Sequence, residues 1–278
     1  MHNTTFFQGL EQTVAAALAE DLGSGDITAE LVPASQRAQA QLICRETAVL
    51  CGRPWVDEVF RQVDADIVVE WHLAEGEALH DGCIVFTLQG SAPALLTAER
   101  TALNFLQTLS GTATLASEYA ALVKDTGLRI LDTRKTIPGL RLAQKYAVRT
   151  GGCHNHRIGL YDAYLIKENH IAACGGIAEV IHTARQRYAD RLVEIEVETL
   201  EQLQQALNAG ADIVMLDNFS LEQLRQAVVL TQGKAVLEAS GGYAREDLAA
   251  VAATGVDCIS VGALTKHLRA TDFSLRFL

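Results

Sequence analysis

Basic side chains and histidines gather in one stretch of the chain, residues 129–170. This stretch holds eight lysines and arginines against three acidic residues, giving a local formal charge of +5 in a chain of −11. Three of the eight histidines also lie there. Nucleic acid attracts proteins whose surface is broadly basic, which an acidic chain does not offer. The concentrated charge therefore predicts a pocket for a small, multiply charged anion.

The basic candidates stand at the ends of short apolar segments. Arg134 and Lys135 follow L-R-I-L-D-T, Lys167 ends A-Y-L-I-K, and His156 and Arg157 lie in the loop between. Arginine binds a carboxylate or phosphate through two parallel hydrogen bonds, whereas lysine acts as a point charge. We expect a ligand with several negative charges. The alternative is that these side chains pair with the chain's own carboxylates on a solvated surface.

Two acidic residues follow later apolar segments in the same way. Glu196 lies in E-I-E-V-E and Asp217 in M-L-D-N-F. Such carboxylates can bind Mg²⁺, hydrogen-bond ribose hydroxyls or stabilise positive charge on a sugar carbon, although they can also serve only as caps.

Two glycine-containing turns close the series, A-S-G-G at 239–242 and S-V-G-A at 260–263. Backbone N–H groups at such turns bind phosphate in many barrels, although the turns can equally be ligand-free.

Three other interpretations stay open. The run Cys153-His154-Asn155-His156 offers metal ligands or a cysteine nucleophile, but its spacing fits no familiar zinc pattern. Lys167 at a strand end is also where a Schiff-base lysine lies in barrel aldolases. E-G-E-A-L-H-D-G-C-I-V-F-T-L resembles the turns of a lipoyl or biotinyl carrier domain, yet it has no lysine at the expected hairpin tip.

The second half of the chain alternates short apolar segments with amphipathic helical ones. Each apolar segment ends in a charge or a glycine, and a weak repeat relates 209–218 to 254–263. Alternating β and α units predict parallel strands with right-handed crossovers, and side chains at the strand ends would surround the mouth of a (β/α) barrel. Neither a G-x-G-x-x-G nor a P-loop motif occurs.

The first half predicts a small α+β domain. Residues 5–22 show helical spacing, strand-like runs separated by glycine turns follow, and 95–123 are helical again. Hydrophobic residues make up 49% and charged residues 21%, which indicates a soluble globular protein. We expect no membrane span, no secretory signal and, from six irregularly spaced cysteines, reduced thiols in the cytoplasm.

Long motifs in chain order carry a resemblance to a known family. They are E-D-L-G-S-G-D-I-T, A-E-R-T-A-L-N-F-L-Q-T-L-S-G-T-A-T, D-T-R-K-T-I-P-G-L-R, N-H-R-I-G-L-Y-D-A-Y-L-I-K-E-N-H, M-L-D-N-F, E-A-S-G-G and S-V-G-A-L-T. Across nearly the whole chain the sequence resembles quinolinate phosphoribosyltransferases, which are type II phosphoribosyltransferases.

The resemblance implies an N-terminal α/β sandwich domain and a C-terminal incomplete (β/α) barrel. We place them at residues 1–112 and 113–270, with a tail at 271–278 packing back on the first domain. It also implies transfer of the phosphoribosyl group of phosphoribosyl pyrophosphate to quinolinate with decarboxylation, in NAD biosynthesis and with Mg²⁺. The implied assembly is a cytoplasmic homodimer, or a larger oligomer, with shared active sites and no nucleic-acid or membrane partner.

The resemblance also implies roles for single residues. Quinolinate would be bound by Arg134, His156, Arg157 and Lys167, together with Arg100 from the neighbouring subunit. The residues implied for catalysis and phosphoribosyl pyrophosphate are Lys135, Glu196 and Asp217, with Ser240, Gly241, Gly242, Gly262 and Ala263 near its phosphate. Two departures from the family pattern occur: Cys153 stands where a third glycine is usual, and L-T-K-H replaces L-T-H-S, with Lys266 and His267.

Overall fold

The computed structural model describes residues 6–278 and groups the chain into two compact units. The first unit contains the chain up to Ser117 together with Thr136–Gly152 and Ala263–Leu278. The second contains Glu118–Lys135 and Cys153–Gly262. Residues 1–5 lie outside the described residues; they include the first residue of the helix predicted at 5–22 and the start of the stretch considered for a secretory signal.

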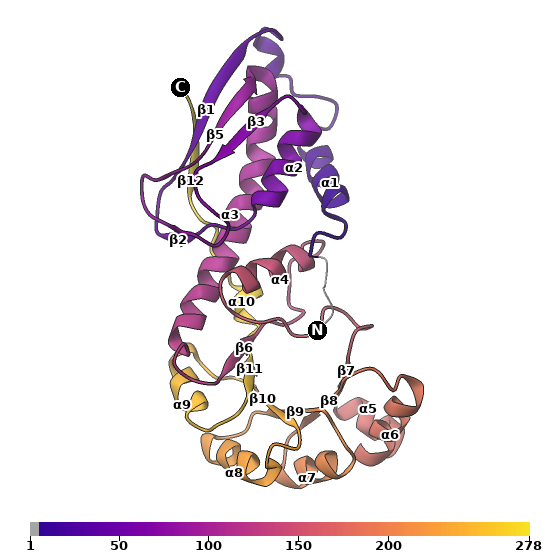
Figure 1. Cartoon of the computed structure of the whole chain (residues 1–278). Helices are drawn as coiled ribbons and strands as arrows, with labels where there is room; N and C mark the ends of the chain where they lie inside the picture. Colours follow the sequence, from indigo (N-terminus) through magenta and orange to yellow (C-terminus); the bar gives the residue numbers. More distant parts are fainter. Residues whose placement is uncertain (1–5) are drawn as a thin grey trace. The chain divides into compact units, whose positions relative to one another are not determined.

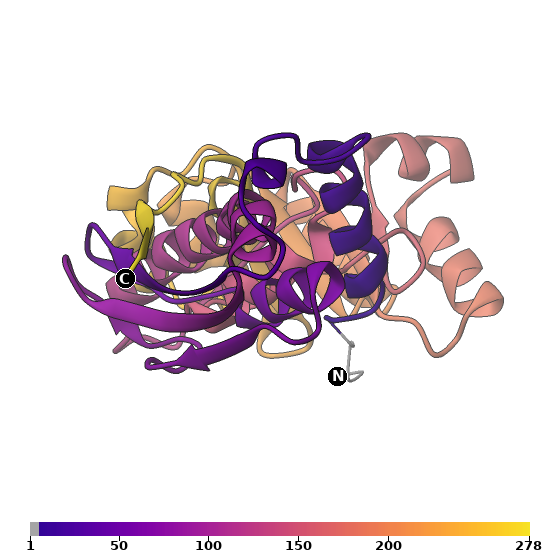
Figure 2. The ribbon, with the colours of Figure 1, turned by 90° about the horizontal axis from the view of Figure 1, so that it is seen from above.

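The first unit is a layer of helices on one face of an antiparallel sheet (Figures 1 and 2). The sheet has the strand order β12-β1-β5-β3. Its strands are β1 (Arg37–Cys44), β3 (Val68–Trp71), β5 (Ile84–Ser91) and β12 (Phe273–Phe277), and β2 (Ala48–Val49) pairs with β4 (Ala78–Leu79). Its helices are α1 (Leu10–Leu22), η1 (Ala29–Leu31), α2 (Arg53–Val63), α4 (Arg141–Thr150), α10 (Ala263–Lys266) and the first part of α3 (Ala92–Leu122).

Alternation along β1 explains this layer. Ala40, Leu42 and Cys44 are buried, while the residues between them are not. They pack with Trp55 and Phe60 of the amphipathic helix α2 in one core. A period of two on the strand and a helical period on α2 therefore bring two apolar faces together.

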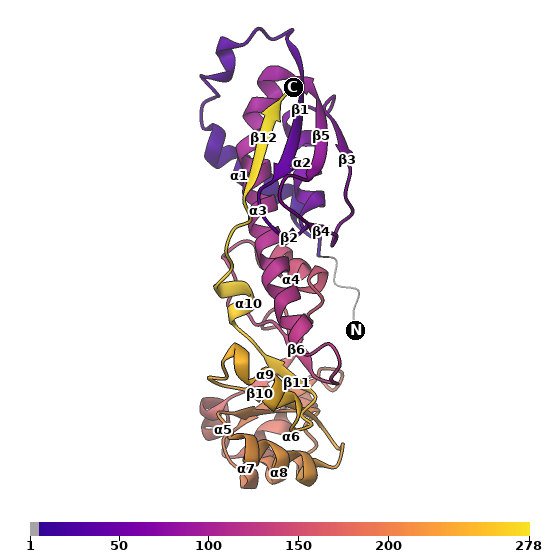
Figure 3. The ribbon, with the colours of Figure 1, turned by 90° about the vertical axis from the view of Figure 1, so that its left-hand side faces the viewer.

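The C-terminal tail adds the last strand to this sheet. Strand β12 runs antiparallel to β1, with Leu42 opposite Leu275 (Figure 3). Residues 113–117, 136–152 and 263–270, which lie inside the expected barrel range, belong to the first unit instead.

The second unit is a six-stranded parallel sheet that curves in an arc with helices outside it (Figure 1). Its strand order is β6-β11-β10-β9-β8-β7, and an isolated parallel bridge joins Leu131 to His154. The strands are β6 (Arg129–Leu131), β7 (Tyr164–Ile166), β8 (Val193–Val197), β9 (Ile213–Asp217), β10 (Val236–Ser240) and β11 (Cys258–Ser260). The helices are α5 (Glu168–Cys174), α6 (Ile177–Arg187), α7 (Leu200–Asn208), α8 (Leu221–Thr231), η2 (Arg245–Asp247) and α9 (Leu248–Ala252). The expected α/β fold with an incomplete barrel is confirmed.

The internal repeat has a structural cause. Gly210 and Gly255 adopt left-handed conformations, with φ of 81° and 89°. Two residues later, Asp212 accepts a hydrogen bond from the backbone N–H of Val193, and Asp257 accepts one from Leu237, both at 2.7 Å. The repeat thus ties neighbouring strands together at their amino ends, opposite the edge where the candidate site lies.

Among the described residues, no helix combines the length and the hydropathy needed to cross a lipid bilayer.

Candidate active site

The predicted site residues of the second unit all lie at the carboxyl edge of the parallel sheet. Asp217 ends β9, Ser240 ends β10 and Glu196 is the penultimate residue of β8. Lys167 follows β7, and Arg134 lies in the loop after β6. Since all six strands run parallel, their carboxyl ends meet along one edge, and residues far apart in the sequence are brought together there.

Arg134 and Arg157 form the cationic part of this edge. The Nε and Nη1 atoms of Arg134 are buried without a hydrogen-bond partner. Arg157 donates from Nη1 to the carbonyl oxygen of Ala163 at 3.2 Å. Burial lowers the pKa of the Arg157 guanidinium, and the nearby charge of Arg134 lowers it further. Two neighbouring like charges, one of them with buried N–H groups that lack a partner, make a site suited to an anion with more than one carboxylate.

Lys167 is held by an acidic neighbour. Its Nζ donates to Oε2 of Glu196 at 2.6 Å, with side chains 45% and 13% exposed. An ammonium in such an ion pair is a charge that can bind an anion, whereas a Schiff-base lysine must offer a neutral amine. The ion pair therefore favours charge binding over imine chemistry.

Lys135 lies over the turn that follows β11. A Cβ atom placed on Gly262 would lie 3.0 Å from Cδ and 3.5 Å from Nζ of Lys135. The backbone N–H of Lys135 donates to Oγ1 of Thr133, which fixes the start of this loop. The absence of a side chain at Gly262 thus lets the lysine come close to the backbone of the second glycine turn.

The other turn, after β10, is fixed by Asn218. The N–H of Asn218 donates to the carbonyl of Ser240, and Gly241 has a φ of 128°. A Cβ on Gly241 would meet Oδ1 of Asn218 at 2.5 Å, whereas a Cβ on Gly242 would enter open space. Gly241 is therefore required by the backbone, and Gly242 leaves room for a ligand.

Asp217 lies beside this turn. Its Oδ2 accepts a hydrogen bond from Nδ2 of Asn218 at 2.8 Å, and its charge contributes to the raised pKa of Tyr243, whose main cause is burial. Carboxylates such as Asp217 and Glu196 are hard oxygen donors of the kind that Mg²⁺ takes singly or in pairs alongside substrate phosphates. The donor set fits the implied ion.

The loop that carries His156 and Arg157 is anchored by a buried carboxylate. Asp132 accepts hydrogen bonds from Nδ2 of Asn155 at 2.7 Å and from the N–H of His156 at 2.9 Å. Burial raises the pKa of the Cys153 thiol to about 12, and the charge of Asp132 adds to the effect. Cys153 is therefore a poor nucleophile. Its φ lies outside the left-handed region, so the backbone at this position does not need the usual glycine.

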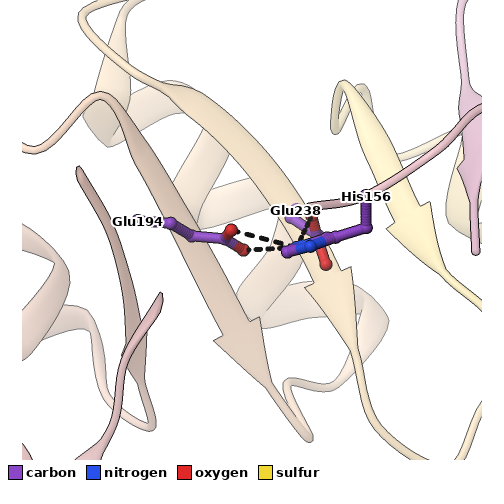
Figure 4. Close-up of side chains that lie close together, drawn as sticks. All are labelled: His156, Glu194 and Glu238. Carbon is purple, nitrogen blue, oxygen red and sulfur yellow. Dashed lines mark hydrogen bonds and ion pairs between the residues drawn. The ribbon is translucent and has the colours of Figure 1, made fainter. Parts of the chain in front are cut away.

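His156 meets two glutamates that the sequence had not singled out. Its Nε2 lies 2.9 Å from Oε2 of Glu194 and 3.5 Å from Oε2 of Glu238 (Figure 4). Both glutamates are almost wholly buried, with 2% and 1% of their surface exposed. Burial raises the pKa of Glu238, and the charge of Glu194 raises it further. Strand alternation was the available signal, because Glu194 lies two residues before Glu196 and faces the same side.

The remaining predicted residues lie in the first unit. Arg100 is exposed on α3, Ala263 begins α10, and Lys266 and His267 are exposed at its end.

Comparisons with known proteins cover nearly the whole chain. Models of the quinolinate phosphoribosyl transferase N-terminal and C-terminal domains match residues 26–110 and 112–276. A Bacillus subtilis protein named as a probable nicotinate-nucleotide pyrophosphorylase (carboxylating) is 42% identical over 92% of this chain and 89% of its own. A Mycobacterium leprae protein of that name is 41% identical over 97% of both chains. The solved nicotinate-nucleotide pyrophosphorylase of Francisella tularensis is 49% identical, with a TM-score of 0.94 over 98% of this chain and 96% of that one.

Proposed function

The chain belongs to the quinolinate phosphoribosyltransferase family, and we propose that it transfers the phosphoribosyl group of phosphoribosyl pyrophosphate to quinolinate. The products are nicotinate mononucleotide, pyrophosphate and carbon dioxide, in the synthesis of NAD. One observation carries the assignment: the neighbouring guanidinium groups of Arg134 and Arg157, with two buried nitrogen atoms of Arg134 unsatisfied, suit a rigid planar dicarboxylate.

Quinolinate would lie against the cationic part of the edge. Arg134 and Arg157 bind its carboxylates, and Lys167 turns from Glu196 towards the ring's acid groups. His156 is also expected in this pocket. Arg100 of a neighbouring subunit supplies a further charge to the same pocket.

Phosphoribosyl pyrophosphate would lie between the acidic residues and the glycine turns. Its 5′-phosphate accepts hydrogen bonds from the turns at Ser240–Gly242 and Gly262–Ala263, and Lys135 binds the pyrophosphate. Glu196 and Asp217 face the ribose and would hold the magnesium ion. When bound, Mg²⁺ neutralises charge on the departing pyrophosphate.

The reaction then needs positioning and charge more than covalent chemistry. The pyridine nitrogen displaces pyrophosphate at the anomeric carbon through an oxocarbenium-like state. Glu196 and Asp217 stabilise the positive charge that develops on the sugar, and Lys135 stabilises the leaving group. The bond between the ring and the 2-carboxylate then breaks and carbon dioxide leaves. The electron pair of that bond stays on the ring carbon, which takes a proton.

The direct test is turnover. Pure protein with quinolinate, phosphoribosyl pyrophosphate and Mg²⁺ should release carbon dioxide and pyrophosphate in equal amounts, and omission of Mg²⁺ should slow the reaction. Nicotinate in a parallel assay should not replace quinolinate. Pyrophosphate release from nicotinate at a similar rate would overturn the substrate assignment.

A second test addresses the homodimer with shared sites. Arg100→Ala and Arg157→Ala proteins should each be inactive, and a mixture allowed to exchange subunits should recover up to about a quarter of wild-type activity. That recovery follows because half of the subunits are in hybrid dimers, each with one intact site. A mixture that stays inactive after exchange would show that each site is complete within one chain. Cytoplasmic location is part of the same proposal, and fractionation of cells that express the protein tests it.

A further inference from the structure

Three ionisable side chains converge at the parallel sheet (Figure 4). Glu194 comes from β8, Glu238 from β10 and His156 from the loop after the Leu131–His154 bridge. Their ligand atoms all lie within 4.8 Å of one another. Neither Glu194 nor Glu238 has an assigned part in the proposed reaction, and His156 is expected there only as a residue that binds quinolinate directly.

The hydrogen bonds of the ring decide its tautomer. The backbone N–H of Arg157 points at Nδ1 of His156 at 2.8 Å, and an N–H can only donate. Nδ1 is therefore the acceptor, and the proton of the neutral ring is on Nε2. That proton faces Oε2 of Glu194 at 2.9 Å, so both ring nitrogens are used inside the protein.

The same geometry argues against a metal ion among these three side chains. A metal on Nε2 needs the lone pair of that nitrogen, so the ring proton would have to move to Nδ1. The N–H of Arg157 already occupies Nδ1. Hydrogen bonding among these side chains explains the arrangement. A metal centre would require the hydrogen bond between the Arg157 N–H and Nδ1 of His156 to break and the loop to change conformation.

His156 and Glu194 each act on Arg157, His156 at its backbone and Glu194 at its side chain. At its backbone, Arg157 is tied to His156 through the Nδ1 hydrogen bond. At its side chain, the negative charge of Glu194 favours the charged guanidinium, which burial and the charge of Arg134 disfavour. Glu194 thus offsets the repulsion that two neighbouring arginines create.

We propose that Glu194 and Glu238 are positioning residues that hold His156 in the Nε2–H tautomer, and that His156 sets Arg157 in place rather than donating a nitrogen to the dicarboxylate. The inference rests on the proposed function, because it gives these residues a task in binding quinolinate. Glu238 completes the group by covering the second side of the Nε2–H, within 3.5 Å.

Nitrogen-15 NMR of histidine-labelled protein tests the tautomer without any turnover. The His156 signals are assigned as those lost in His156→Gln. We expect a protonated Nε2 and an unprotonated Nδ1, and the same pattern after addition of quinolinate. A protonated Nδ1, or a ring that changes tautomer or takes a second proton when quinolinate binds, would overturn the proposal.

Kinetic measurements on Glu194→Gln test whether this residue helps to position Arg157 for quinolinate binding. At metal sites, replacing a residue that orients a ligand side chain typically lowers metal affinity or activity 10–100-fold. We expect the KM for quinolinate to rise by a factor in that range, with kcat and the KM for phosphoribosyl pyrophosphate changed less than about threefold. Glu179→Gln, which removes an exposed carboxylate from α6 of the same unit, should change none of these values.

An unchanged KM for quinolinate, or an equal rise in both KM values, would contradict the proposal. If Glu194→Gln does not fold, the NMR measurement on the wild-type protein still decides the question. If the wild-type protein does not turn over quinolinate, the proposed function fails, while the ligand-free tautomer independently supports or overturns the positioning role.

Discussion

Replacement of Arg134 by methionine should weaken ligand binding and, at the same time, stabilise the ligand-free protein. In the ligand-free protein, two buried nitrogen atoms of Arg134 lack partners, and its charge opposes that of Arg157. Methionine keeps an unbranched side chain of similar length without the charge or the unsatisfied N–H groups. The guanidinium is therefore costly in the ligand-free state and useful only when an anion is bound.

The structure sets the size of both effects. An unsatisfied buried polar group costs about 1–3 kcal/mol, so the variant should gain stability of this order. For a chain of this size, that gain raises Tm by at least about 2 °C. Loss of two hydrogen bonds to a charged ligand costs roughly 3 kcal/mol, which is about 150-fold in Kd for quinolinate.

Thermal unfolding followed by circular dichroism, and calorimetric titration with quinolinate, measure the two quantities on the same samples. Arg187→Met, at an exposed position near the end of α6, is the matched control and should change neither. A lower Tm for Arg134→Met would refute the claim that the side chain is strained without its ligand. If Arg134→Met bound quinolinate with wild-type affinity, the placement of Arg134 in the quinolinate pocket would be refuted.

Three other predictions follow from the same edge of the sheet. Glu238→Gln should flatten the pH dependence of stability. Burial raises the pKa of the Glu238 carboxyl above its ordinary 4.5, so the wild type loses stability relative to the variant as the pH rises from 4.5 through the raised pKa. Urea titrations across pH 4–8 can measure this difference. Gly241→Ala should lose about 1–3 kcal/mol of stability, because Gly241 has a positive φ and Asn218 lies close to it. Gly242→Ala should melt like the wild type but bind phosphoribosyl pyrophosphate less tightly. Equal melting temperatures for the two variants would contradict the turn geometry. Glu196→Gln should shift stability by less than about 1 kcal/mol, because its ion pair with Lys167 is partly exposed, yet lower kcat by roughly 100-fold; unchanged turnover would remove it from the catalytic groups.

Much of the site could be predicted because strand ends are marked in the sequence. A short apolar run followed by Asp132, Lys167 or Asp217 gives both the strand and the side on which its functional group lies. Parallel β/α units then require all these ends to meet at one edge, whatever the rest of the fold does. That rule needs no knowledge of packing, and it correctly placed the cationic and acidic residues of the second unit at a common edge.

The grouping of residues 136–152 with the first unit could not be predicted in this way. Arg134 and Lys135 end a segment of the second unit, and the chain changes units at Thr136, within the motif T-R-K-T-I-P-G-L-R. The structure forms a helix at 141–150, but local periodicity contains no information about which core such a helix joins. This choice is made by long-range packing, through contacts such as that of Gln144 with the carbonyl of Thr265.

Glu194 and Glu238 show a different limit, because their signal was present but ambiguous. A glutamate in an apolar strand is either exposed on the outer face or buried inside the sheet, and alternation alone cannot say which face is inside. Their burial next to His156 resolves the question and explains how an acidic chain can carry a strongly cationic site. The arginines stand on loops, while Glu194, whose negative charge favours the charged guanidinium of Arg157, is fixed on strand β8. A carboxylate built into the sheet thus offsets the repulsion between Arg134 and Arg157 whether or not an anion is bound.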